Sequence, residues 1–262
     1  MILLGAENLS VSLGKQSVLK GITFQADKPQ LIGLVGPNGA GKTTLIRSLA
    51  GQQGIRSGSV TLQGQDLEKL SAKERAKSLA YLPQQRNVHW PLSVSEVVML
   101  GRHPHRSGFA GPGKQDMEAV QKALTQMEVA CFADRPFKTL SGGEQARVLM
   151  ARALAQDTPI LLADEPMAGL DPAHQISLMQ HFRRLVQAGQ TVFLSIHEIS
   201  LAARWCDRLL VLQDGVLKED GLPEQVLSEE TLSSVFQVGA YLASVSNRPL
   251  IVPLEPPEEP RI

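Results

Sequence analysis

The chain has 262 residues, with 26 lysines and arginines against 26 aspartates and glutamates, so its formal net charge is zero. A hydrophobic content of 43% and a charged content of 20% are typical of a folded globular protein and exclude a disordered or collagen-like chain. The charge balance argues against a general nucleic-acid binder, and two cysteines cannot make a disulfide scaffold. We expect one large domain or two closely joined ones, without a signal peptide or a membrane span.

The first third of the chain predicts a β region followed by a buried strand and a helix. Residues 1–26 alternate between apolar and polar types and contain turn signals, which indicates antiparallel strands. Leu31–Val35 is a short continuous apolar run, typical of a strand that is buried on both faces. A glycine-rich loop follows, and then a predicted helix from about Gly41 to Ala50.

The rest of the chain alternates between helical and strand patterns. Residues from about 71 to 150 are predicted to be mostly helical, with a loop from Gly101 to Lys114. Ile160–Ala163 and Thr191–Ile196 predict two further buried strands. Asp214 and Gly215 stand between apolar runs and predict a hairpin, and the last ten residues, with four prolines and three glutamates, predict an unpacked tail. Together these patterns indicate an α/β fold.

A helix is predicted to begin just after Asp171. Asp171 can cap it, Pro172 suits its first position, and Gly189 suits its exit. Four apolar residues of this helix are predicted to share one buried face: Ile176, Met179, Phe182 and Val186.

Eight consecutive residues fit the phosphate-loop pattern G-x-x-x-x-G-K-[ST] without a mismatch. They are Gly36, Pro37, Asn38, Gly39, Ala40, Gly41, Lys42 and Thr43, and Thr44 follows them in the predicted helix. Glycines let successive backbone N–H groups face one anion, and the start of the helix adds a positive dipole end. Lys42 supplies a charge to the β- and γ-phosphates, and the Thr43 hydroxyl can bind Mg²⁺. A turn that binds nothing is the alternative, and the flanking strand and helix disfavour it.

Two carboxylates follow the second buried strand. Asp164 and Glu165 stand at its carboxyl end, the edge where α/β sheets bind ligands. We expect Asp164 to hold the water shell of Mg²⁺. Glu165 is expected to polarise a water molecule that attacks the bound phosphate. A helix cap or a solvated acidic turn is the alternative.

Residues 140–144 read Leu-Ser-Gly-Gly-Glu, which has two compatible interpretations. Ser141 and Glu144 form the pattern of a capping box that opens a helix. Gly142 and Gly143 also leave backbone N–H groups available for a phosphate. Here the sequence closely resembles the nucleotide-binding subunit of ABC transporters, whose signature is LSGGQ or LSGGE, and the resemblance covers about residues 3–238.

The resemblance implies a P-loop NTPase core with a mainly parallel sheet, an N-terminal antiparallel β subdomain and an inserted helical subdomain that carries the signature. We therefore expect an ATPase domain over residues 1–240, with the helical subdomain at about 85–150. Residues 241–262 are expected to form a C-terminal extension that is partly disordered.

The resemblance also implies roles for individual residues. Gln84 corresponds to the family's glutamine that senses Mg²⁺ and the γ-phosphate, with the adjacent Gln85 as the alternative. Its implied role adds Gln84 to the Mg²⁺ site of Thr43 and Asp164. His197, with Gln84 and Glu165, completes the expected catalytic set, and Asp171 corresponds to an aspartate that organises the dimer contact.

Members of this family work as dimers that clamp ATP between the loop of one subunit and the signature of the other. Ser141, Gly142, Gly143 and Glu144 are therefore expected to contact the nucleotide of a second copy. The family usually stacks adenine on an aromatic residue, and this sequence departs from that pattern because Leu13 stands at the corresponding place.

One stretch narrows the kind of transporter. Residues 94–105 resemble the V-x-E-x-V-x-x-G-R-x-P-H pattern of ATPases that import iron–siderophores, haem or cobalamin. We expect an ATPase at the cytoplasmic face of the inner membrane, bound to separate permease subunits and served indirectly by a substrate-binding protein. Residues from Val88 to Arg102 are expected to line the groove for a permease helix, and His103 and His105 are expected to form a solvated loop rather than a metal site. A soluble ABC ATPase and a nucleotide-gated regulator are the alternative functions.

Overall fold

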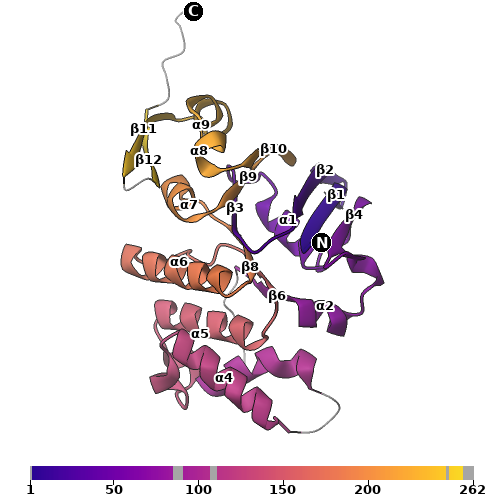
Figure 1. Cartoon of the computed structure of the whole chain (residues 1–262), viewed down its shortest axis with the longest axis vertical. Coiled ribbons are helices and arrows are strands. Elements are labelled where there is room, and N and C mark those ends of the chain that lie inside the picture. The colour runs from indigo at the N-terminus through magenta and orange to yellow at the C-terminus, as the bar shows by residue number, and fades with distance from the viewer. Residues whose placement is uncertain (1, 85–90, 107–110, 246–247, 256–262) are drawn as a thin grey trace, which may run out of the picture.

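The structure is a computed structural model that describes residues 2–84, 91–106, 111–245 and 248–255 (Figure 1). Its centre is a six-stranded sheet in the order β10-β9-β3-β8-β7-β6, in which β10 is antiparallel to β9 and the other neighbours are parallel. The strands are β3 (Leu31–Val35), β6 (Leu79–Leu82), β7 (Ile160–Ala163), β8 (Thr191–Ser195), β9 (Arg208–Gln213) and β10 (Val216–Gly221). The predicted α/β fold with a mainly parallel sheet is confirmed.

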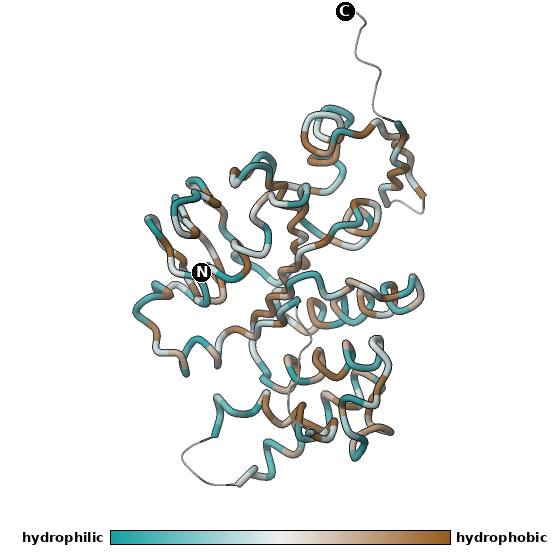
Figure 2. Tube along the Cα trace, turned by 180° about the vertical axis from the view of Figure 1, so that it is seen from behind, coloured by the Kyte–Doolittle hydropathy of each residue, from teal (hydrophilic) through white to brown (hydrophobic). Residues whose placement is uncertain are grey.

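The central strands separate two apolar cores because their side chains alternate between the two faces of the sheet. In β3, Leu31 and Val35 pack into one core and Ile32 and Leu34 into the other, and all four are fully buried. Figure 2 shows this apolar band running through the middle of the molecule. Such burial on both faces explains why these strands read as continuous apolar runs.

A second, antiparallel sheet lies on one side of the central sheet, in the order β2-β1-β4-β5. Its strands are β1 (Leu4–Leu13), β2 (Gln16–Ala26), β4 (Ser57–Leu62) and β5 (Gln65–Asp66). The antiparallel pairing of β1 and β2 confirms the β region predicted for residues 1–26. Helix α1 (Lys42–Leu49) packs into the core between the two sheets, within the bounds predicted for it.

A helical segment joins two adjacent strands of the central sheet, β6 and β7, and lies at one end of the molecule (Figure 1). Its helices are α3 (Val94–Met99), η2 (Leu100–His105), α4 (Lys114–Gln126), η3 (Ala130–Phe132), η4 (Phe137–Thr139) and α5 (Gly142–Ala155). Before β6 come η1 (Leu67–Lys69) and α2 (Ala72–Ser78).

The prediction that residues from about 71 to 150 are mostly helical is confirmed among the described residues, with two local corrections. Residues 79–82 form strand β6 rather than helix, because a four-residue apolar run gains its conformation from pairing with β7. The predicted loop from Gly101 to Lys114 begins with the 3-10 helix η2. Residues 107–110 of that loop lie outside the described residues.

Helix α6 (Pro172–Gln187) begins as predicted. The Asp171 side chain accepts a hydrogen bond from the N–H of His174, and Pro172 occupies the first helical position. Met179 and Phe182 are fully buried and Val186 packs against the same core. The prediction was wrong for Ile176, which is 45% exposed because it lies in the second turn, where the helix extends beyond the core.

The C-terminal quarter contains a confirmed hairpin and an unexpected one. Asp214 and Gly215 both have positive φ, at 51° and 78°, and turn β9 into β10. After α7 (Ile199–Trp205), α8 (Pro223–Val226) and α9 (Glu229–Phe236), strands β11 (Gly239–Val245) and β12 (Arg248–Leu254) form a second hairpin. Ile251 of β12 is buried, and its carbonyl accepts a hydrogen bond from Ser200 of α7 at 2.5 Å. The expected C-terminal extension thus contains an ordered hairpin, while residues 256–262 of the predicted tail lie outside the described residues.

Candidate active site

The phosphate loop connects β3 to α1. Backbone conformation and close contacts with neighbouring atoms require glycine at two of its positions, Gly41 and Gly36. Gly41 precedes α1 with φ 104°, a conformation that favours glycine, and no side chain caps the helix there. A Cβ atom on Gly36 would lie 2.0 Å from the carbonyl oxygen of Leu212. The first N–H groups of a helix have no partner within it, so the loop presents free donors at the start of α1. This is the geometry of an anion site.

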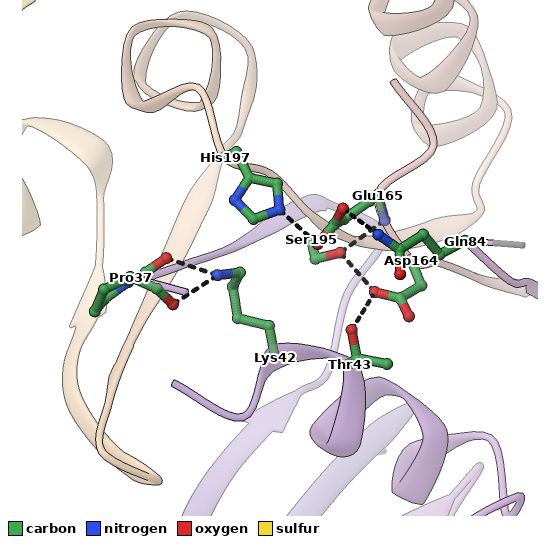
Figure 3. A network of polar contacts seen from close by, with 9 residues as sticks. Pro37, Lys42, Thr43, Gln84, Asp164, Glu165, Ser195 and His197 are labelled. Carbon is green, nitrogen blue, oxygen red and sulfur yellow. Dashed lines mark hydrogen bonds and ion pairs between the residues drawn. The ribbon is translucent and has the colours of Figure 1, made fainter. Parts of the chain in front are cut away.

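Lys42 lies over this loop and is held by the loop's own carbonyl groups. Its Nζ donates hydrogen bonds to the carbonyl oxygens of Gly36 at 2.7 Å and Pro37 at 2.9 Å (Figure 3). Burial lowers the pKa of the Lys42 ammonium, while the charges of Glu165 and Asp164 oppose that shift. The side chain is therefore fixed at the place where the sequence predicts a phosphate contact.

The end of β7 and the end of β8 meet beside the loop. Asp164 is fully buried, and its Oδ1 accepts hydrogen bonds from the Thr43 hydroxyl at 3.1 Å and the Ser195 hydroxyl at 2.9 Å. The Ser195 hydroxyl in turn accepts from the backbone N–H of Glu165 at 2.8 Å. Burial raises the pKa of Asp164 above its usual range, and the hydrogen bonds from Ser195 and Thr43 oppose that shift.

The other carboxylate oxygen of Asp164, Oδ2, is buried and has no hydrogen-bond partner. A buried carboxylate oxygen without a partner is costly unless a cation or a donor occupies the position beside it. Among the described residues there is no cluster of three or more histidine, cysteine or acidic side chains that could hold a metal ion. The donor set fits Mg²⁺, which takes one or two protein oxygens and completes its shell with water and phosphate.

Glu165 is contacted from two sides. Its Oε2 accepts a hydrogen bond from Gln84 Nε2 at 2.5 Å, and its Oε1 lies 2.5 Å from Nε2 of His197 (Figure 3). Gln84 comes from the chain after β6 and His197 from the chain after β8, so three strand ends meet at one carboxylate. Each carboxylate oxygen keeps a further lone pair that can accept a proton from water.

The backbone of Glu165 is in the left-handed region, with φ 47°. This conformation is unfavourable for residues other than glycine and is often found at functional sites. The hydrogen bond from its N–H to Ser195 stabilises the unusual turn. Ser195 is the member of the site that the sequence did not single out, although its place as the polar end of an apolar strand was a usable signal.

The signature residues lie elsewhere. Ser141 caps α5, and both hydrogen bonds of the predicted capping box are present, from the N–H of Ser141 to Glu144 at 2.7 Å and from the N–H of Glu144 to Ser141 at 3.4 Å. Ser141 and Gly142 are exposed. A cavity over the phosphate loop is lined by twelve residues, none from the signature: Leu13, Gln16, Val18, Asn38, Gly39, Ala40, Gly41, Lys42, Thr43, Thr44, Glu165 and His197.

The structure therefore brings together most of the residues singled out in the sequence. The phosphate loop, both carboxylates, Gln84 and His197 share one site, and Leu13, which is 47% exposed, lies at the rim of its cavity. The signature and Asp171 are not part of that cavity's lining. Gln85 and residues 88–90 of the predicted permease groove lie outside the described residues.

Comparisons with known proteins agree with this geometry. Residues 19–168 match the family described as ABC transporter. The chain is 41% identical to the hemin import ATP-binding protein HmuV of Streptomyces coelicolor over 90% of this chain and 83% of that protein. It is 40% identical to the protein of the same name from Pseudomonas fluorescens, over 95% of this chain and 99% of that one. A cobalamin import ATP-binding protein, BtuD of Halobacterium salinarum, is 40% identical over 89% of this chain and 58% of that protein.

Solved structures show the same fold. A chain described as part of an inward-facing metal-chelate type ABC transporter superposes with a TM-score of 0.84 at 26% identity, over 97% of this chain and 98% of that one. A dimeric bacterial ABC transporter cassette superposes with a TM-score of 0.75 at 27% identity, over 84% of this chain and 98% of that one. Sequence, site geometry and fold thus agree, and the chain belongs to the ABC transporter family as one of its ATPases.

Proposed function

We propose that this chain is the ATP-hydrolysing subunit of an importer for a metal-containing chelate, working as a homodimer that drives a separate membrane permease. The observation that carries the proposal is the connected network at the strand ends. Thr43, Asp164, Ser195, Glu165 and Gln84 are linked by hydrogen bonds beside an open phosphate loop. Such an arrangement suits attack of water on a terminal phosphate more than simple anion binding.

In this proposal the chain's own residues divide the work of hydrolysis. The loop N–H groups and Lys42 bind and orient the phosphates, and charge stabilisation supplies most of the catalysis. Glu165 accepts the proton of the attacking water, while Gln84 and His197 hold its carboxylate in place. Thr43, Asp164 and Gln84 would hold Mg²⁺, which neutralises charge on the phosphates.

The placement of the signature supports a dimer. Ser141 to Glu144 are outside the lining of this chain's own phosphate cavity, and they stand at the start of α5 with Ser141 and Gly142 exposed, so a second copy can reach them. In a head-to-tail dimer this helix start would face the nucleotide of the other copy, with Asp171 at the contact and Leu13 beside the adenine. We also propose that residues 1–240 form the ATPase domain, with residues 85–150 as its inserted helical subdomain.

The printed names of the relatives support the kind of cargo. Two of them are described as hemin importers and one as a cobalamin importer, and these cargoes share with iron–siderophores a metal held by an organic chelator. Our proposal covers this class, with an iron chelate as the cargo and haem or cobalamin as the alternatives. His105 was expected in a solvated loop, but it lies half-buried in η2 and its Nε2 donates to the carbonyl of Gln156 at 2.7 Å, so we propose no cargo-binding role for it.

The site of action follows from the permease. Among the described residues no helix is long and apolar enough to cross a membrane. We propose that the chain binds permease subunits at the cytoplasmic face of the inner membrane and communicates with a substrate-binding protein only through them.

Two measurements test this function. The purified chain should hydrolyse ATP only when Mg²⁺ is present, and the Glu165→Gln variant should accumulate as an ATP-bound dimer on size-exclusion chromatography. The chain should also co-purify with a permease after detergent extraction, and vesicles containing both should take up ferric siderophore, haem or cobalamin in an ATP-dependent manner. A chain that hydrolyses ATP but co-purifies with no permease and supports no uptake would instead favour the soluble ABC ATPase.

A further inference from the structure

A second polar cluster surrounds Gln156, the residue that follows the last turn of α5. Its side-chain Nε2 donates to the carbonyl oxygens of Ala76 at 2.6 Å and Leu79 at 2.9 Å. Ala76 belongs to α2, and Leu79 is the first residue of β6. One carboxamide therefore fastens the end of α5 to the start of β6.

These contacts require the chemistry of glutamine. Both amide hydrogens are directed at carbonyl oxygens, and a glutamate at this position would have no hydrogen to donate when ionised. An asparagine would be one methylene shorter. Strand β6 is the edge strand of the central sheet and, among the described residues, pairs only with β7, so the Gln156 side chain adds a tie on the side that has no neighbouring strand in the sheet.

The end of α5 is itself held firmly by η2. Arg102 donates to the carbonyl of Ala155 at 2.8 Å and forms an ion pair with Asp116 at 3.0 Å. A Cβ atom on Gly101 would lie 2.1 Å from the carbonyl oxygen of Arg152, so η2 is pressed directly against the last turns of α5. The Gly-Arg-x-Pro-His segment singled out in the sequence thus fixes this helix end and provides a rigid base for Gln156.

Both elements joined at Gln156 lead to the proposed catalytic groups. Helix α5 begins at the signature and is about 21 Å long, at 1.5 Å per residue. Strand β6 leads after about 10 Å, at roughly 3.3 Å per residue, toward Gln84, which holds Glu165. The carbonyl of Leu82, at the end of β6, also accepts a hydrogen bond from the N–H of Asp164 at 2.9 Å.

We propose that Gln156 is a positioning residue for ATP hydrolysis, fastening the signature helix to the strand that places Gln84. This inference rests on the roles proposed above for Gln84 and the signature. Without the contact, the start of β6 keeps its packing against α5 but loses this hydrogen-bonded link, and Gln84 holds the carboxylate of Glu165 less well. We expect nucleotide binding at the phosphate loop to be unaffected, because the hydrogen bonds of Gln156 go to α2, β6 and η2 rather than to the loop.

The test compares Gln156→Leu with a matched control in the full-length chain. Gln190 is also half-buried, and its Nε2 donates to a backbone carbonyl at 2.6 Å, but that carbonyl belongs to Thr158, before β7, and not to β6. For Gln156→Leu we expect kcat to fall about three- to tenfold, the size of one neutral hydrogen bond, with KM for ATP unchanged. Gln190→Leu should also lower the melting temperature, by less than Gln156→Leu because it removes one hydrogen bond rather than two, and it should leave kcat within twofold of the unchanged chain.

A double-variant cycle with Gln84→Ala shows whether the effect passes through Gln84. If it does, adding Gln156→Leu to Gln84→Ala lowers kcat no further, because the group being positioned is already gone. Independent, multiplying losses would overturn the inference, as would an equal loss of kcat in Gln190→Leu. If Gln156→Leu does not fold, Gln156→Asn replaces it in both comparisons, because its shorter side chain cannot reach both carbonyl groups. Unchanged kcat in Gln84→Ala would overturn the site assignment itself, and the inference with it.

Discussion

Ser195 is predicted to stabilise the active site through both of its hydrogen bonds, and Ser195→Ala removes them together. The hydroxyl donates to Asp164 at 2.9 Å and accepts from the N–H of Glu165 at 2.8 Å, and the residue is fully buried. An unpaired buried donor costs about 1–3 kcal/mol, and a hydrogen bond to a charged group contributes about 1.5–3 kcal/mol. Because these effects overlap, we expect the free energy of unfolding to fall by about 2–4 kcal/mol in total.

Urea unfolding followed by circular dichroism measures this loss, with Ser48→Ala as the control. Ser48 is equally buried, at 1% exposure, but its hydroxyl donates to the carbonyl of Thr44 within its own helix at 2.8 Å. In the variant that carbonyl still accepts its backbone hydrogen bond within the helix. The free energy of unfolding of the control should therefore fall by no more than about 0.5 kcal/mol. Equal losses in the two variants would show that the network around Ser195 has no special contribution.

A second readout separates the site from general stability. The hydrogen bond from Ser195 favours the charged form of Asp164, whose pKa is already raised by burial. Without it we expect the Mg²⁺ concentration for half-maximal hydrolysis to rise, because a carboxyl that is harder to ionise binds the cation less well. An unchanged Mg²⁺ requirement in a folded variant would refute the proposed link between Ser195 and the metal site.

Three further substitutions test the other members of the network. Glu165→Gln should lower turnover about 100-fold or more and leave ATP binding intact, the effect of removing a general base, so full turnover would exclude that role. Lys42→Ala should weaken ATP binding measured by calorimetry about 10- to 100-fold, as expected for a lost charge-assisted hydrogen bond, and unchanged affinity would contradict its phosphate contact. Asp164→Asn should abolish hydrolysis yet raise the free energy of unfolding by about 0.5–2 kcal/mol, because burial disfavours the charge it removes. Lower stability in that variant would show that the carboxylate is well compensated in the fold.

The sequence predicted those parts of the site whose chemistry is contiguous. The phosphate loop and the Asp164–Glu165 pair each lie within a few residues, so their spacing can be recognised without knowledge of the fold. Strand β6 was missed because a four-residue apolar run after a helical pattern is equally compatible with helix, and its pairing with β7 lies about 80 residues away in the chain. The pairing with β7 makes these residues a strand, and the same pairing places Gln84, just after β6, beside Glu165.

The C-terminal hairpin was missed for a related reason. Pro249 and Pro253 lie within β12, and proline normally argues against a strand. Here the two-stranded sheet leaves β12 with a free edge, where a missing N–H costs nothing, and the burial of Ile251 against α7 supplies the stability that the strand pair lacks. Local composition could not show that α7 covers this segment.

Glu165, the proposed general base, has a backbone conformation that conflicts with local preference. Its φ of 47° would suit glycine, and a non-glycine residue held there costs on the order of 1 kcal/mol or more. Glycine would relieve the backbone but remove the carboxylate that Gln84 and His197 contact. The Ser195 hydroxyl holds the strained N–H and the neighbouring Asp164 at once, so a single buried side chain offsets both costs at the site. The sequence places Ser195 about 30 positions from the residues it supports, and only the parallel pairing of β7 with β8 makes that support visible.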